Sequence, residues 1–291
     1  MTRAGLALVA GLALVPAAHA QMPMLGGAGD NAKPIGIEAQ NGIEWQQNNH
    51  LYIARGHATA TRGDNKVTAD TLTAFYRPDP AHPPAVTKAG NDPTAGGSTQ
   101  IYRLEARGHV IFTNPNEIMT GDDGVYDIDS ATLVVTGKGL KIVTPRDTIT
   151  ARDSLEWYDQ KQIGVARGNA VAVRADRRVR GDVLMAHVAK LANGQSHISR
   201  IDADGNVLIS SPGQVARGDA GVYNLDSGIA TLTGHVRLTR GENELRGRYA
   251  VVDLNTNVSR LLSTPPGTQV AGGDAKVEGL IMPRRKQEEG K

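Results

Sequence analysis

Apolar and polar side chains alternate along most of the chain, in runs that begin just after a repeated glycine. Val110 and Phe112 stand two and four positions beyond Gly108, with polar or exposed-type residues around them. Successive side chains of a β-strand point to opposite sides, so this spacing puts small or apolar residues on one face. The same offsets recur at Ala58 and Ala60, Ala170 and Ala172, Val207 and Ile209, and Val236 and Leu238.

A second alternating run opens on an aspartate fourteen residues after the glycine, as in Gly108 to Asp122 and Gly205 to Asp219. Turn-forming Asp, Asn, Ser and Gly residues separate the runs, as hairpins require. The alternation therefore predicts an all-β protein of repeated antiparallel hairpins, without helices. Positions two and four beyond the aspartate, or its equivalent, should face the same interior: Leu72 and Ala74, Gly124 and Tyr126, Leu155 and Trp157, Leu184 and Ala186, Gly221 and Tyr223, and Ala250 and Val252.

The runs belong to an internal repeat. Residues 121–137 and 218–234 read GDDGVYDIDSATLVVTG and GDAGVYNLDSGIATLTG, and nine of these seventeen positions are identical. A match of that length indicates tandem duplication of one hairpin unit. A further copy ends near Asp153, but its glycine is either Gly137 or Gly139, and that register stays open. Whether the repeats form one continuous sheet structure or two also stays open.

The first twenty residues have the pattern of a cleaved signal peptide. Arg3 precedes an apolar run from Leu6 to Val15 that is too short to span a bilayer, and Ala18-His19-Ala20 is a small-x-small cleavage site. We therefore expect export through residues 1–20. Residues 21–36, rich in Gly and Pro, predict a flexible lead-in.

Residues 37–282 are predicted to form the sheet structure. A stretch crowded with Pro and Gly, residues 77–98, predicts a loop inserted between repeats. The charged tail, residues 283–291, is predicted to be disordered.

Composition narrows the possible chemistry. Lys plus Arg (32) nearly balances Asp plus Glu (30) without a basic stripe, so nucleic acid is not an expected partner. Gly is abundant (34), aromatic residues make up 4%, and there is no cysteine, so small and β-branched side chains must build the core without disulfides.

Several motifs suggest sharper chemistry, and each has a simpler explanation. His57, His109 and His235 share one repeat position and could form a metal ladder, but that position points outward, where a solvated side chain is the simpler reading. Residues 202–206 resemble the opening of a calcium loop, yet its twelfth position is Gly213 instead of Glu. The recurrent aspartates follow the repeat, whereas catalysis needs one unique constellation. We assign no metal, cofactor or catalytic residue.

The phrases A-R-G-H-A/V and G-D-x-G-V-Y-x-x-D-S, together with the export segment, resemble the OstA-like family over roughly residues 37–262. The resemblance implies an elongated β-jellyroll with a V-shaped cross-section, open along its length, in a periplasmic protein that is not an enzyme. It also implies a role in shielding the acyl chains of lipopolysaccharide and passing this lipid from the inner to the outer membrane for outer-membrane assembly.

Read with this resemblance, the inward residues become the expected lipid-binding groove: Leu72, Ala74, Val110, Phe112, Tyr126, Leu155, Trp157, Leu184, Val207, Ile209, Tyr223, Val236, Leu238 and Val252. The implied partners are lipopolysaccharide, the related domains of the inner-membrane (LptC) and outer-membrane (LptD) transport components, and further copies of the chain joined head to tail through a terminal strand near Val251. Two alternatives remain: a structural β-solenoid without a lipid ligand, and a β-helical polysaccharide-active enzyme.

Overall fold

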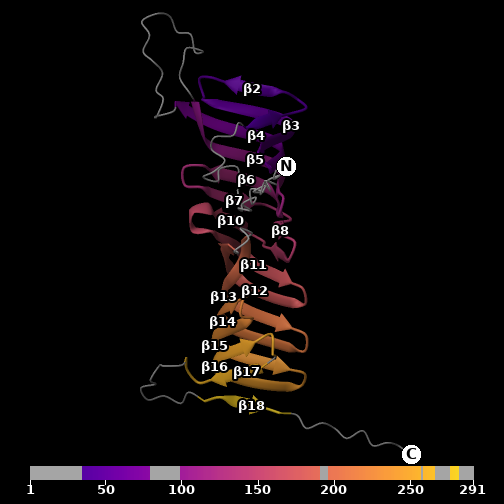
Figure 1. The fold of residues 1–291 in the computed structure, drawn as a ribbon, viewed down its shortest axis with the longest axis vertical. Helices are drawn as coiled ribbons and strands as arrows, with labels where there is room; N and C mark the ends of the chain where they lie inside the picture. Colours follow the sequence, from indigo (N-terminus) through magenta and orange to yellow (C-terminus); the bar gives the residue numbers. More distant parts are fainter. Residues whose placement is uncertain (1–34, 79–98, 191–195, 257, 266–275, 282–291) are drawn as a thin grey trace, which may run out of the picture.

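The computed structural model describes residues 35–78, 99–190, 196–256, 258–265 and 276–281. The expected signal peptide, almost all of the lead-in and of the loop insertion, and the C-terminal tail lie outside the described residues. What is described is a narrow, elongated stack of strands that runs from β2 at one end to β18 at the other (Figure 1).

Eighteen strands and one 3-10 helix make up the regular structure of the described residues. Their bounds are β1 Gly36–Glu38, β2 Ile43–Gln46, β3 Leu51–Arg62, β4 Asn65–Pro78, β5 Thr99–Asn114, β6 Glu117–Asp127, β7 Thr132–Thr136, β8 Lys141–Val143, β9 Asp147–Thr150, β10 Ser154–Tyr158, η1 Asp159–Lys161, β11 Ile163–Arg174, β12 Arg177–Lys190, β13 Ser196–Ser211, β14 Gln214–Asn224, β15 Ile229–Arg240, β16 Asn243–Asp253, β17 Val258–Leu262 and β18 Glu278–Leu280.

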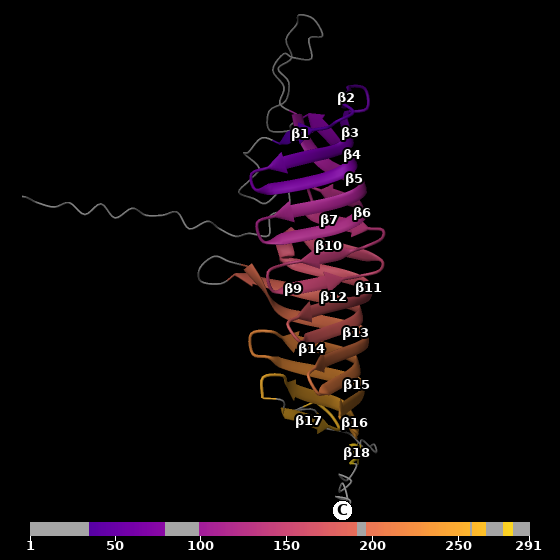
Figure 2. The same ribbon diagram turned by 90° about the vertical axis from the view of Figure 1, so that its right-hand side faces the viewer.

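Every pairing is antiparallel, and all strands belong to one sheet. Strands β3 to β6 pair in sequence order, as do β11 to β16. Between these blocks the ladder divides into two arms, because β6 pairs with both β7 and β8 while β11 pairs with both β9 and β10. The sheet is therefore continuous through the middle of the molecule (Figure 2).

Every second long strand carries a β-bulge at the corner where the sheet bends from one wall of the jellyroll to the other: β3, β5, β11, β13 and β15. In β5 the pairing with β6 shifts between Arg107 and Val110, and the two residues in between have positive φ, +77° at Gly108 and +50° at His109. A Cβ on Gly108 would lie 2.2 Å from Asp70 Oδ2, so only glycine fits this corner.

The corner contact also resolves the open register. Gly168, Gly205 and Gly234 each lie against the aspartate of the copy before them, as Gly108 does. Gly137 lies against Asp122 in the same way, with a virtual Cβ 2.4 Å from Asp122 Cβ, whereas Gly139 has nothing within 4 Å. Gly137 is therefore the corner glycine of the ambiguous copy.

The terminal strand is not where we expected it. Val251 lies in β16 and is paired on both sides, with Thr231 of β15 and Arg260 of β17. The expectation was wrong because a short alternating run, β17, and the separate strand β18 both add to β16 beyond it. One described edge of the sheet is thus formed by β17 and β18, and the other by β1 and β2, which both pair with β3.

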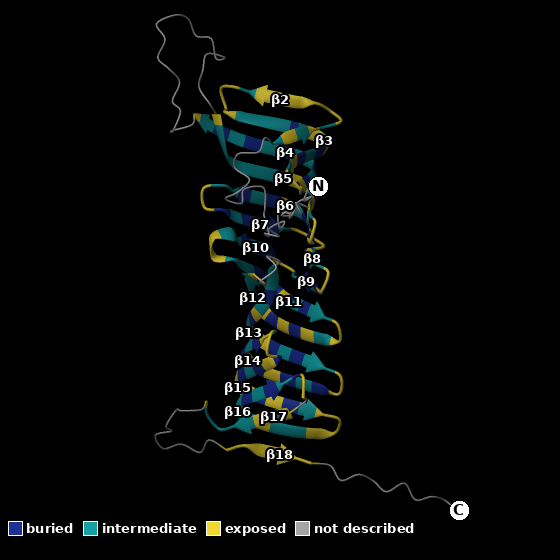
Figure 3. Cartoon of the chain, viewed as in Figure 1, coloured by how far each residue is buried: buried dark blue, intermediate teal, exposed yellow. Residues whose placement is uncertain are grey.

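The core lies between the two walls along the whole stack. One hydrophobic cluster of buried residues extends from Ala54 in β3 to Leu254 just after β16. Buried and exposed residues alternate along the strands, and exposed residues gather at turns and ends (Figure 3). The period of two in the sequence is therefore the period of burial in the structure.

Candidate functional site

The predicted groove residues all lie on the inner side of the sheet. Thirteen of the fourteen are buried, and Phe112 is half-buried. They come from both walls of the jellyroll. Residues two and four positions after a corner glycine, such as Val110, lie on one wall, and residues at the same offsets after the aspartate, such as Tyr126, lie on the other. The structure therefore brings the predicted residues together in one apolar interior.

The described part of the interior contains pockets of different size. An apolar pocket near the N-terminal end has a volume of about 30 Å³ and is lined by Phe112, Tyr126, Ala60 and Val67 among others. A second pocket of about 30 Å³ lies in the middle and includes Leu155. Each would hold about two water molecules. These two can admit an acyl chain only if the two walls move apart. A larger pocket, of about 260 Å³, lies at the C-terminal end and is lined by Leu238, Leu245 and Ile281 together with polar residues such as Gln214.

The rim of the interior carries a row of polar residues that sequence reasoning missed. Each strand that follows a hairpin tip begins with one of them, five residues before the aspartate or its equivalent: Asn65, Glu117, Arg177, Gln214 and Asn243. Asn65, Glu117 and Gln214 are buried despite their polarity. The constant spacing was a signal in the sequence, but it does not reveal which residues face this row.

Arg177 joins the two walls across the mouth in the C-terminal half. Its Nη1 donates to the Tyr223 hydroxyl at 3.2 Å, and its Nη2 donates to the Leu254 carbonyl at 3.0 Å and to Asn255 Oδ1 at 3.1 Å. One strand pair further on, the Gln214 amide donates to Ser259 Oγ at 2.6 Å. Side-chain hydrogen bonds therefore fasten the mouth in this half.

The corresponding tyrosine of the N-terminal half has no such bond. Tyr126 is 2% exposed, and its hydroxyl has no hydrogen-bond partner within the described ranges. Asn65 Oδ1, which lies at the rim position equivalent to Arg177, also lacks one there. Burial raises the pKa of Tyr126 to about 12, so the phenol is neutral and keeps its proton for donation.

Glu117 and Trp157 occupy the positions of Asn65 and Tyr126 in the next repeat. The Trp157 ring nitrogen is buried and has no partner in the part of the chain that the structure describes. Burial raises the pKa of Glu117 to about 7, against a smaller opposing effect of its hydrogen bond with Asn114. A carboxyl with such a pKa is partly protonated at neutral pH.

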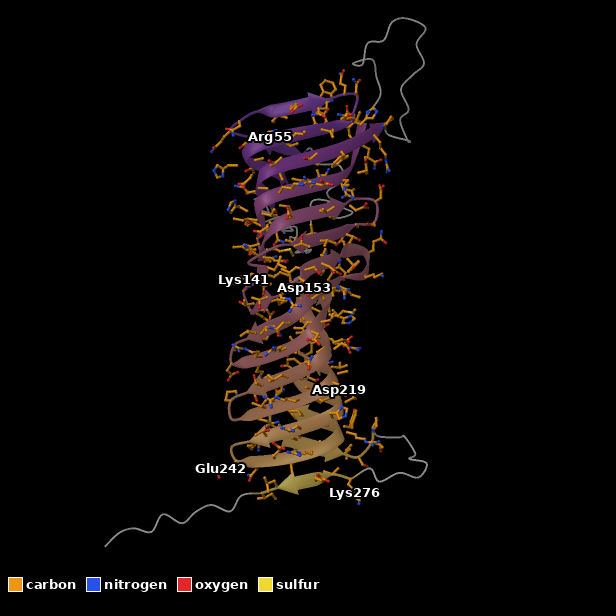
Figure 4. All side chains as sticks on the ribbon, turned by 180° about the vertical axis from the view of Figure 1, so that it is seen from behind. Arg55, Lys141, Asp153, Asp219, Glu242 and Lys276 are labelled. Atoms are coloured by element: carbon orange, nitrogen blue, oxygen red, sulfur yellow. The ribbon has the colours of Figure 1, made fainter. Side chains whose placement is uncertain are left out.

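The outer faces carry paired charges. Arg103 and Arg107 both contact Glu105, and charged side chains such as Arg55 and Asp219 line the outside of the stack (Figure 4). His109 is largely exposed and its Nδ1 lies 2.8 Å from Asp70 Oδ2, a hydrogen bond that raises the pKa of the histidine.

The corner histidines do not form a metal cluster with their neighbours. Among the residues that the structure describes, no group of three or more His, Cys, Asp or Glu side chains could hold a metal ion. Within the same residues, no helix has the length and apolar character needed to cross a bilayer.

An elongated antiparallel sheet with an apolar interior, a polar rim and charged outer faces defines the class of β-jellyroll proteins. The chain belongs to the LptA/(LptD N-terminal domain) LPS transport protein family, whose model matches residues 36–153 and again residues 148–258. The two matched segments meet in the middle, where the sheet divides into two arms.

Two further comparisons give individual relatives. An uncharacterized protein from Rhizobium meliloti (strain 1021) is 27% identical over 134 residues, which is 46% of this chain and 64% of that protein's length. The crystal structure of LptH, the LptA homologous periplasmic component of the lipopolysaccharide transport device from Pseudomonas aeruginosa, is similar to 47% of this chain and covers 95% of its own. That likeness has 17% sequence identity and a TM-score of 0.41.

Proposed function

We propose that this protein binds the acyl chains of lipopolysaccharide in its interior and passes the lipid across the periplasm toward the outer membrane. The observation that carries the proposal is the single apolar cluster that runs between the two walls from Ala54 to Leu254. Each methylene exposed to water costs about 0.8 kcal/mol, so a chain of about a dozen carbons costs roughly 10 kcal/mol to carry unshielded. An apolar channel removes that cost without a rigid polar geometry, which suits sliding.

The ends of the stack support a bridging role. Strands β1 and β2 at one end and β17 and β18 at the other leave one side unpaired in the described structure, and such edges accept further strands. Trp45 and Leu280, at opposite ends, are 52% and 62% exposed. Head-to-tail contact with further copies, or with the related LptC and LptD domains, would extend the channel in a line.

We assign the protein no catalytic step. The repeated aspartates, which could have suggested a polysaccharide-active enzyme, have a structural reason to recur: Asp70 and Asp219, for example, each contact a corner glycine and the histidine after it. A structural β-solenoid with a filled core is the remaining alternative. The two small pockets favour it, whereas the larger pocket beside Leu238 does not.

Photo-crosslinking separates these two possibilities. A light-activated residue at Phe112, Tyr126, Ile209 or Tyr223 should give lipopolysaccharide adducts in cells, because these side chains face the interior. The same residue at the exposed outer positions 123 and 235 should give none. Adducts nowhere, or at inner and outer positions alike, would contradict a lipid channel and favour the filled core.

A further inference from the structure

Three aromatic side chains occupy the same repeat position along the mouth. Tyr126, Trp157 and Tyr223 each stand four residues after a corner aspartate. A rim residue begins the strand two places back in the sheet in each case: Asn65 in β4 for β6, Glu117 in β6 for β10, and Arg177 in β12 for β14. The sheet orders β4-β5-β6, β6-β7-β10 and β12-β13-β14 define these three equivalent pairs.

Of these three pairs, one is hydrogen-bonded across the mouth within the described residues, Arg177 with Tyr223. The asparagine that replaces arginine at the first pair has a side chain several bonds shorter. Its Oδ1 and the Tyr126 hydroxyl both stay buried without partners, as does the Trp157 ring nitrogen. A buried polar atom that makes no hydrogen bond is costly, so native proteins pair such atoms with protein, water or ligand groups.

We propose that these groups form a polar subsite, at the mouth of the N-terminal half, for a neutral hydroxyl or amide group at the head of a lipid acyl chain. Asn65 Oδ1 can only accept, the Trp157 ring nitrogen can only donate, and the Tyr126 hydroxyl can do either. A hydroxyl or an amide both donates and accepts, so it can satisfy this set. The subsite rests on the proposed function, because it takes the same lipid as the interior.

The neighbouring apolar pocket gives the rest of such a ligand a place. Tyr126 lines it together with Val67, two residues beyond Asn65 on the same face of β4. An acyl chain that enters this pocket would leave a polar group near its head beside the Tyr126 hydroxyl. A phosphate only accepts hydrogen bonds at its ionised oxygens and would leave Asn65 Oδ1 without a donor, which is why the ligand group is a hydroxyl or an amide and not a phosphate.

The test compares two probes that differ by one hydroxyl, N-tetradecanoyl glucosamine and N-(3-hydroxytetradecanoyl) glucosamine, by titration calorimetry on the full protein. The wild type should bind the hydroxylated probe about tenfold more tightly. Tyr126→Phe should reduce this preference to about twofold, and Asn65→Ala should reduce it similarly. Tyr158→Phe removes a phenol hydroxyl that bonds Glu156 instead, and it should leave the preference unchanged.

The outcomes distinguish the subsite from the proposed function. If both probes bind the wild type equally, or if Tyr126→Phe keeps the full preference while its circular dichroism spectrum is unchanged, the subsite is overturned and the lipid channel stands. If neither probe binds, the proposed function fails and the subsite fails with it.

Discussion

The two halves of the molecule place the same tyrosine in different surroundings. Residues 121–126 and 218–223 are matched copies within the repeat, and Tyr126 and Tyr223 are buried to nearly the same degree. The Tyr223 hydroxyl accepts a hydrogen bond from Arg177, whereas the Tyr126 hydroxyl has no partner within the described residues. Duplication has therefore kept the inward-facing residues of the repeat, while the polar residue at the rim differs from one repeat to the next.

This difference shows where specificity can reside in a repetitive fold. The inward-facing residues are apolar in both halves, and apolar contacts do not depend on orientation as hydrogen bonds do. Only the rim, with Asn65, Glu117 and Arg177 in equivalent places, gives each rung its own hydrogen-bonding character. Three substitution experiments compare the halves at this rim.

Removing the bridge of the C-terminal half should have the largest effect. Arg177→Ala deletes the bonds to Tyr223, Leu254 and Asn255 and leaves two buried acceptors unsatisfied, so we expect the free energy of unfolding to fall by about 3 kcal/mol. The matched change Asn65→Ala deletes an atom without a partner and should cost less than about 1 kcal/mol. Urea unfolding followed by circular dichroism measures both, and equal losses would contradict the difference between the halves.

The buried carboxyl of the N-terminal half should make stability depend on pH. Glu117 has a pKa of about 7 in the folded protein and an ordinary value of 4.5, so between these values the folded state holds a proton that the unfolded state has released. The free energy of unfolding therefore falls as pH rises through this window, and Glu117→Gln should raise it by about 2 kcal/mol at pH 8.

Urea unfolding at pH 5, 6, 7 and 8 would show this effect as a flatter profile for Glu117→Gln. Glu105→Gln, on the outer face of β5, is the control and should keep the slope of the wild type. Parallel profiles for wild type and Glu117→Gln would mean that Glu117 is ionised in the folded protein throughout.

The smallest contrast concerns the two hydroxyls themselves. Tyr223→Phe loses a hydrogen bond and should lower the free energy of unfolding by about 1 kcal/mol. Tyr126→Phe removes a buried hydroxyl without a partner in the described chain, so stability should stay the same or rise slightly. The measurement is the difference between the two urea midpoints, and a greater loss for Tyr126→Phe would reverse the comparison.

Much of the fold could be predicted because alternation needs no knowledge of distant residues. The positions two and four beyond Gly108 and Asp122 are inward-facing in the structure, since a strand repeats every two residues wherever it lies. The choice between Gly137 and Gly139 could not be made in this way. Both have positive φ, and only the contact with Asp122 on the neighbouring strand separates them.

The partners of the rim residues and the strand at the sheet edge could not be predicted from alternation, because both depend on the order of strands in the sheet. Asn65, Glu117 and Arg177 share a spacing that is visible in the sequence, but their partners lie two strands away. Val251 was taken for an edge because the strands that cover it are short and interrupted. Both features require knowing which strands pair, and alternation alone does not contain that information.

The unbroken ladder through the middle has a consequence for assembly. The two family segments, residues 36–153 and 148–258, meet without a subunit interface, because β6 and β11 are connected through both arms of the same sheet. A joint between separate subunits obeys mass action and comes apart on dilution, whereas a covalent one does not. The junction between these two segments is therefore independent of protein concentration.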